Sequence, residues 1–143
     1  MAKVTGLGGV FFRCEDPAGM RDWYREQLGI ESEEYGFPFM WRESERPEKR
    51  GYTVWNPFPV ETKYFDPSAK QFMVNYRVDD LPELLRRFEA AGVEIVGEMV
   101  EEENGKFAWV LDPEGNKIEL WEPIDSDLDP YLPQSGLPQS ESD

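Results

Sequence analysis

The chain has 143 residues, 39% of them hydrophobic, and its 30 acidic and 15 basic residues give a net charge of −15. Such a surface repels phosphate backbones and anionic headgroups, so neither a nucleic acid nor a membrane is expected as a partner. No apolar run approaches the roughly 18 residues that span a bilayer, and the single cysteine excludes an internal disulfide. We therefore expect an acidic cytoplasmic protein.

The first predicted module occupies residues 1–55 and opens with an apolar strand in "GLGGVFF". Asp16 followed by Pro17 is typical of a helix N-cap and first turn, and Gly29 is a typical helix end. Short β-strands are expected after this helix at 33–37, 39–43 and 51–55.

Residues 56–71 contain three prolines and are predicted to be a linker without regular structure. The second predicted module, residues 72–123, has the same plan: a strand, a helix from Asp80 to Gly92, and strands at 94–100, 106–111 and 117–121. "DPEGN" (112–116) is a typical hairpin turn between the last two strands. Residues 124–143 are rich in Pro, Ser and Asp, which predicts a mobile acidic tail.

The two modules are an internal repeat. Arg77 follows Arg13 by 64 residues, and Gly92 follows Gly29 by 63. Near the end of each module, "YTVWNP" matches "IELWEP", which aligns Thr53 with Glu119 at an offset of 66. Nearly constant spacing at several places indicates two homologous modules of strand, helix and three strands.

Three motifs carry a resemblance to a known superfamily: "GLGGVFFRCEDPAGMRDWYREQLGI", "FMVNYRVDDLPELLRRFEAAGVEI" and "DPEGNKIELWEP". They resemble the vicinal oxygen chelate superfamily, which contains glyoxalase I, bleomycin-resistance proteins and extradiol dioxygenases. The resemblance implies an α+β fold in which two βαβββ modules in tandem form a half-barrel cleft. It also implies a homodimer.

Relatives commonly bind one divalent metal through four inward side chains, and the resemblance places these positions at Gly9, Thr53, Met73 and Glu119. Only Glu119 is a usual ligand, since glycine has no side chain and a thioether is too soft for Mg, Mn or Zn. The chain also has no histidine, so the usual His-His-carboxylate iron site cannot form and a dioxygenase is disfavoured. No cofactor is expected, and an atypical divalent metal remains open.

Alternation along the strands predicts which side chains face the cleft. The side chain of Val54, and those of the residues that share its face of the sheet, are expected to pack under the helices. The opposite parity gives the predicted ligand-binding residues Phe11, Trp55, Met73, Asn75, Arg77 and Trp121. Glu119 shares this face and is the candidate catalytic residue.

Three functions remain open from the sequence. The first is a small-molecule-binding protein with an aromatic cleft, holding an aromatic or cationic compound. The second is a glyoxalase-like lyase or isomerase with Glu119 as general base. The third is a structural or interaction protein with a closed cleft, whose tail binds a partner. For Glu119 itself, the structural alternative is an ion pair with Arg13 or Arg77, or a hydrogen bond from the Asn75 amide.

Overall fold

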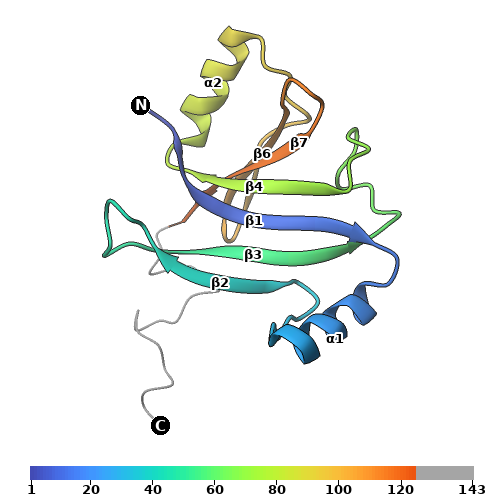
Figure 1. Ribbon diagram of the computed structural model, residues 1–143. Coiled ribbons are helices and arrows are strands. Elements are labelled where there is room, and N and C mark those ends of the chain that lie inside the picture. The colour runs from blue at the N-terminus through green and yellow to red at the C-terminus, as the bar shows by residue number, and fades with distance from the viewer. Residues whose placement is uncertain (125–143) are drawn as a thin grey trace.

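The computed structural model describes residues 1–124, so the predicted tail, except Ile124, lies outside the described residues. The described elements form one sheet of seven strands with two helices (Figure 1). In chain order they are β1 (Val4–Cys14), α1 (Pro17–Leu28), β2 (Phe37–Arg42), β3 (Arg50–Pro59), β4 (Phe72–Val78), α2 (Leu81–Ala91), β5 (Val100–Glu102), β6 (Gly105–Leu111) and β7 (Lys117–Pro123).

The strand order of the sheet is β2-β3-β1-β4-β7-β6-β5. β1 and β4 pair antiparallel at its centre, β1 is parallel to β3, and β4 is parallel to β7. Each half of the sheet therefore comes from one module, and the repeated strands occupy matching places. This arrangement confirms the predicted α+β fold of two tandem modules. Neither described helix is both long and apolar enough to cross a membrane.

Both helices begin and end as predicted. Asp16 accepts a hydrogen bond from the Gly19 amide at 3.1 Å, and Asp80 accepts one from the Glu83 amide at 3.2 Å. The glycine after each helix has a left-handed backbone, with φ of 74° after α1 and 79° after α2. Such a backbone ends a helix at little cost only for glycine, which is why the repeat preserves it.

The predicted strands at 33–37 and 94–100 are largely absent. Residues 33–36 instead close a tight turn, in which the amides of Glu33 and Gly36 each bond the other's carbonyl. In the second segment, Gly97 has a φ of 75°, which interrupts an extended chain. Only the isolated bridge between Ile95 and Val110 remains before β5. The first module therefore has two strands after its helix, whereas three were expected.

β3 is longer than predicted and runs through Pro57 to Pro59, so the chain between β3 and β4 is residues 60–71. Its pairing with β2 ends where Phe37 meets Trp55, while its pairing with β1 continues as far as Pro59. Beyond Trp55, one side of β3 thus has no partner strand. An edge of this kind accepts proline, which has no N–H to donate.

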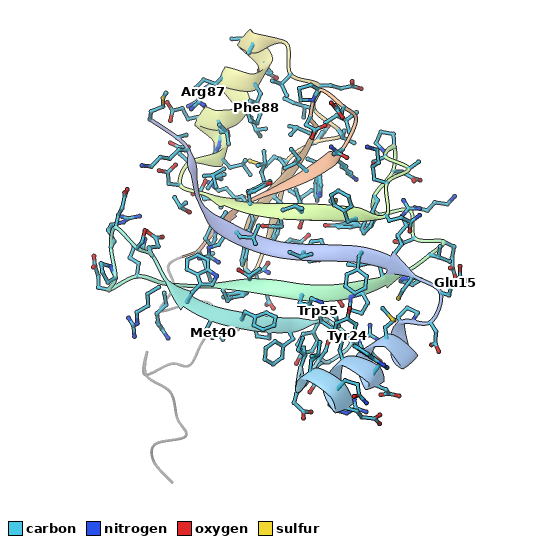
Figure 2. The ribbon with its side chains drawn as sticks, in the orientation of Figure 1. Glu15, Tyr24, Met40, Trp55, Arg87 and Phe88 are labelled. Atoms are coloured by element: carbon cyan, nitrogen blue, oxygen red, sulfur yellow. The ribbon has the colours of Figure 1, made fainter. Side chains whose placement is uncertain are left out.

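The helices cover the outer face of the sheet. Beneath α2 lies the main buried cluster, formed by Ala2, Val78, Leu81, Leu84, Ala108, Val110 and Leu120. α1 buries no residue to the same degree and contacts the sheet through Tyr24, whose ring lies 4.7 Å from that of Trp55 (Figure 2). The opposite, concave face is left for the site described next.

Candidate functional site

A cavity of about 230 Å³ opens on the concave face of the sheet. Its walls are mostly aromatic: Phe11, Tyr35, Tyr52, Phe58, Tyr64, Phe107 and Trp121. The polar side chains in its lining include Asn56, Asn75 and Glu119. The aromatic residues therefore surround a space and do not fill it, unlike the closed cleft of the third interpretation.

Glu119 is 3% exposed and accepts hydrogen bonds on both carboxylate oxygens. Oε1 accepts from the Asn75 amide nitrogen at 2.6 Å, and Oε2 accepts from the Trp109 indole at 2.9 Å. The Tyr64 hydroxyl also donates to Oε2. Of the partners expected from the sequence, the described structure forms the Asn75 bond and no ion pair from Arg13 or Arg77 to this carboxylate.

Strand register brings these groups together. Asn75 on β4 lies opposite Glu119 on β7, and Glu119 lies opposite Trp109 on β6. Directly paired residues on neighbouring strands project to the same face, so the three side chains form a row across the second half of the sheet. A buried carboxylate is costly without donors, and this row together with Tyr64 supplies them.

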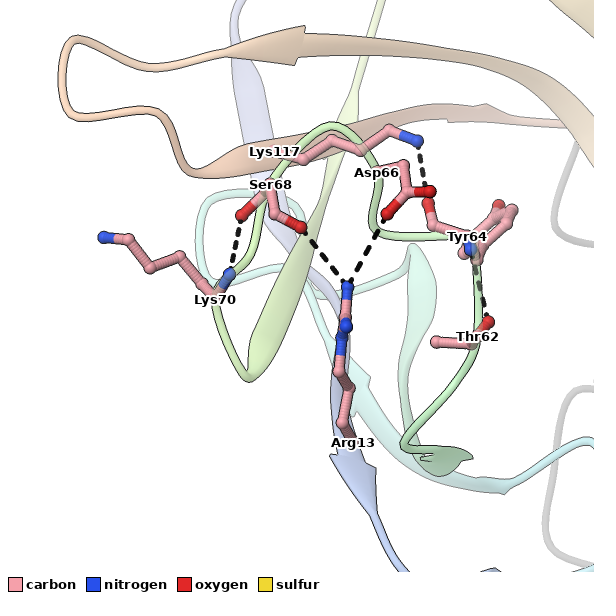
Figure 3. A network of polar contacts seen from close by, with 7 residues as sticks. All are labelled: Arg13, Thr62, Tyr64, Asp66, Ser68, Lys70 and Lys117. Carbon is pink, nitrogen blue, oxygen red and sulfur yellow. Dashed lines mark hydrogen bonds and ion pairs between the residues drawn. The ribbon is translucent and has the colours of Figure 1, made fainter.

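Tyr64 comes from the chain between the modules (Figure 3). The next residue, Phe65, is fully buried. The backbone carbonyl of Tyr64 accepts a hydrogen bond from Lys117 Nζ at 2.7 Å. The Arg13 guanidinium donates to the Ser68 carbonyl at 3.2 Å in the same loop. These anchors hold the Tyr64 ring flat against Phe58, with centroids 5.7 Å apart and an interplanar angle of 11°.

The polar network alters two pKa values. Burial raises the pKa of Tyr64 well above its usual range, and the adjacent Glu119 charge raises it further. Tyr64 is therefore held protonated as a donor. Burial lowers the pKa of Lys117, an effect that the charges of Glu119 and Asp66 oppose.

Four of the predicted site residues reach the cavity: Phe11, Asn75, Glu119 and Trp121. Met73 is fully buried and packs with Phe11 and Phe65 behind the wall.

Arg77 is also absent from the cavity lining. Its guanidinium lies 4.7 Å from the ring centre of Trp121 and 5.5 Å from that of Tyr52. A third ring, that of Trp41, lies at 5.4 Å. Arg77 shares the face of its strand partner Trp121 and packs against two aromatic walls, so it does not itself border the cavity and its role in ligand binding stays a prediction.

The predicted face of β3 is wrong by one residue. Trp55 packs on Tyr24 and on Phe12, at 5.6 Å, on the outer face, and Val54 lines the cavity in its place. Thr53 also points away from the cavity: its hydroxyl donates to the Leu7 carbonyl and accepts from the Trp41 indole at 2.7 Å. The cause is the parallel register of β1 and β3, which sets Gly9 opposite Val54.

The same register shows which residue of the first module corresponds to Glu119. Phe11 lies opposite Asn56 on β3, as Asn75 lies opposite Glu119 on β7. Asn56 precedes Glu119 by 63 residues, the offset that already relates the helix-ending glycines. Applying the offset of 63 to Glu119 would have identified Asn56 as its counterpart in the first module. The similarity of "YTVWNP" to "IELWEP" instead gave Thr53, three positions away. No periodic pattern pointed to Tyr64, which lies in a loop.

The four residues predicted at the metal positions do not gather as a divalent-metal site, and Asn56, which replaces Thr53 in the observed register, offers only a neutral amide. Gly9 offers no ligand atom, Met73 is enclosed by apolar side chains, and the Thr53 hydroxyl is engaged elsewhere. Glu119 Oε2 already accepts from both Tyr64 and Trp109, and Oε1 accepts from Asn75, so this one carboxylate has little capacity left for a metal. Within residues 1–124, no three Asp, Glu, Cys or His side chains gather as a metal-binding group.

The sequence from residue 9 to residue 121 matches the model of a family described as the glyoxalase-like domain. The chain belongs to this family. A search of curated proteins found no match. The family and the two-module sheet agree with the superfamily resemblance seen in the sequence.

Solved structures share the fold at low identity. Methylmalonyl-CoA epimerase from Streptomyces coelicolor, in complex with 2-nitronate-propionyl-CoA, is 13% identical with a TM-score of 0.61, over 85% of this chain and 99% of that one. The Mycobacterium tuberculosis epimerase is 22% identical with a TM-score of 0.54, over 86% and 91%. A glyoxalase/bleomycin resistance protein/dioxygenase superfamily member from Vibrio splendidus is 16% identical with a TM-score of 0.51, over 85% and 99%.

Proposed function

We propose that this glyoxalase-like domain binds a small aromatic or apolar molecule in the cavity, oriented by Glu119 and without the metal its superfamily commonly uses. The supporting observation is an aromatic-walled cavity of about 230 Å³ with one buried carboxylate held by three donors. Small-molecule sites have this composition of apolar walls and few fixed polar groups. The volume lies below the range of drug-sized pockets, which favours a compound with a single ring.

Binding is favoured over proton abstraction by the state of Glu119. A general base needs a lone pair within hydrogen-bond reach of the substrate proton. Three donors already engage this carboxylate, and Tyr64 and Trp109 share Oε2. Only Oε1, with the single donor Asn75, retains capacity for a further partner. That capacity suits a ligand-orienting acceptor.

A cavity-filling variant tests the site. Val54 lines the cavity and is partly buried, so Val54→Trp should occupy the space that a ligand needs. Single-ring compounds screened by ligand-observed NMR should bind the parent protein and should fail to bind Val54→Trp. Val4→Trp is the matched control, because Val4 is 48% exposed at the start of β1 and outside this cavity. Equal binding by all three proteins, with folding checked by circular dichroism, would place the ligand elsewhere.

Metal independence is tested on untagged protein offered Zn, Mn, Ni, Co and Fe in turn. Elemental analysis should find no stoichiometric metal, and a chelator should leave ligand binding unchanged. About one metal per chain, lost in Glu119→Ala, would overturn this part of the proposal. A histidine tag must be avoided because it would supply the imidazoles that the chain lacks.

A further inference from the structure

A second hollow, of about 540 Å³, lies beside the cavity. Tyr64, Asn104 and Phe107 line both spaces. Val100 and Trp109, from β5 and β6, line the second hollow and not the cavity. The two spaces are therefore neighbours, and the side chains that they share separate one from the other.

From this arrangement we infer that Tyr64 is the residue that determines the size of the ligand. Its ring closes the cavity toward the second hollow, so the cavity accepts a compound with one ring and excludes one with two fused rings. This inference rests on the proposed binding function. It extends that function by naming the residue that sets the size limit.

The Tyr64 ring lies where the two spaces meet. It stacks on Phe58, a wall of the cavity, with centroids 5.7 Å apart and an interplanar angle of 11°. It also contacts Trp109, a wall of the second hollow, with centroids 6.2 Å apart and an angle of 86°. Tyr64 is 39% exposed, so these neighbours do not enclose it and a ligand can reach it.

The ring is held at both ends. Its hydroxyl donates to Glu119 on β7. At the other end, the backbone carbonyl accepts from Lys117 Nζ at 2.7 Å, and the same ammonium lies 5.5 Å from the ring centre. To leave the boundary between the two spaces, the ring would have to give up hydrogen bonds that it has already formed. Tyr64 therefore acts as a fixed partition.

One cation from each module fixes the loop that carries Tyr64 (Figure 3). Lys117 belongs to the second module, and Arg13 belongs to the first. The Arg13 guanidinium donates to the Ser68 carbonyl at 3.2 Å and lies 5.0 Å from the ring centre of the buried Phe65. Neither cation lines the cavity. Arg13 and Lys117 are therefore positioning residues, which act on the ligand through Tyr64.

Removing the ring should join the two spaces. Asn104 and Phe107 already border both, so they would form a continuous wall once the partition is gone. The second hollow is the larger space, and Val100 and Trp109 give it apolar walls. A fused second ring would bury more apolar surface there and should bind more tightly for that reason.

Two matched probes test the size limit: benzyl alcohol and 2-naphthalenemethanol, which differ by one fused ring. Ligand-observed NMR titrations of the parent protein should show about tenfold or more tighter binding of the single-ring compound, against the trend expected from apolar surface alone. Equal or tighter binding of the two-ring compound would overturn the size inference and leave the binding function intact. Failure of both compounds to bind would overturn the inference and remove the support for the binding function.

Variants at residue 64 locate the effect. Tyr64→Ala should reverse the preference, to about tenfold in favour of the two-ring compound. Tyr64→Phe is the matched control, because it removes the hydroxyl and keeps the ring, and it should still prefer the single-ring compound. Tyr64→Leu covers the case in which Tyr64→Ala does not fold, and it should bring the preference close to unity. A preference for the single ring that is unchanged in a folded Ala or Leu variant would contradict the inference.

Two further variants test the neighbours of Tyr64. Val100→Trp should fill the second hollow, so in the Tyr64→Ala background it should restore the preference for the single ring. Lys117→Met should weaken the parent's preference about threefold, because it releases the Tyr64 carbonyl. Lys63→Met is its control, since it removes an equal charge at an exposed position of the same loop and should keep the full preference. Equal preferences in the two lysine variants would refute the positioning role of Lys117.

Discussion

The two modules have the same order of elements but contribute different side chains to the core and to the cavity. The half-sheet built from β4, β5, β6 and β7 carries the buried cluster beneath α2 and the Asn75–Glu119–Trp109 row. The half-sheet built from β1, β2 and β3 carries a helix with no fully buried residue, and the pair equivalent to Asn75 and Glu119 is Phe11 and Asn56. A repeated backbone therefore does not imply repeated chemistry. The second half provides the buried carboxylate and the main buried cluster, whereas both halves contribute aromatic walls to the cavity.

The largest expected difference between the modules concerns their helices. Leu84 is 4% exposed beneath α2, and the residue 64 positions earlier, Met20 in α1, is only partly buried. Leu84→Ala should lower the free energy of unfolding by roughly 2–5 kcal/mol, through lost burial and the cavity left behind. Met20→Ala should cost about 1 kcal/mol. Urea unfolding measures both, and equal losses would refute the unequal division of the core.

A second contrast compares the equivalent polar residues. Glu119→Leu leaves three donors without an acceptor, so it should cost about 2–3 kcal/mol of stability. Asn56→Leu removes an oxygen that has no donor among the described residues, so it should be close to neutral or stabilising. Urea midpoints of the two variants test this difference in sign. A large loss in Asn56→Leu would mean that this amide also carries structure.

The sequence predicts the helices well because their signals are local. Asp16, Pro17 and Gly29 define α1 within a few residues, and the same signals recur for α2. Alternation also placed Phe11, Asn75, Glu119 and Trp121 on the concave face, because these strands continue without interruption through the paired residues.

The face of β3 could not be obtained in this way, because it depends on pairing between strands. Parallel pairing with β1 sets Val54 and Asn56 inward, and a short sequence match gave the wrong alignment. Tyr64 was missed for a related reason. A loop residue has no periodic pattern, and the position of Tyr64 follows from the buried Phe65 and from a long-range bond with Lys117 at the start of β7, which no local pattern predicts.

The glycines that end the two helices are a feature in which the modules are alike. A Cβ on Gly29 or on Gly92 would meet nothing within 4 Å, so only the left-handed backbone opposes substitution. Gly29→Ala and Gly92→Ala should each cost about 1–2 kcal/mol. Thermal unfolding of the two variants should agree closely. A clear difference would show that the weakly packed α1 frays without affecting global unfolding.

The smallest effect concerns Tyr64, which belongs to neither module and connects them, since it stacks on Phe58 and donates to Glu119. Burial and the Glu119 charge raise its pKa in the folded state, so folding keeps its proton bound. Stability from this group is full below its ordinary pKa of about 10 and is lost as the pH rises above it. Tyr64 is 39% exposed as a residue, so solvent screening should keep the contribution below about 1 kcal/mol. Urea midpoints above pH 10 should therefore fall more steeply in the parent protein than in Tyr64→Phe. Parallel curves would mean that this hydroxyl does not connect the two halves through Glu119.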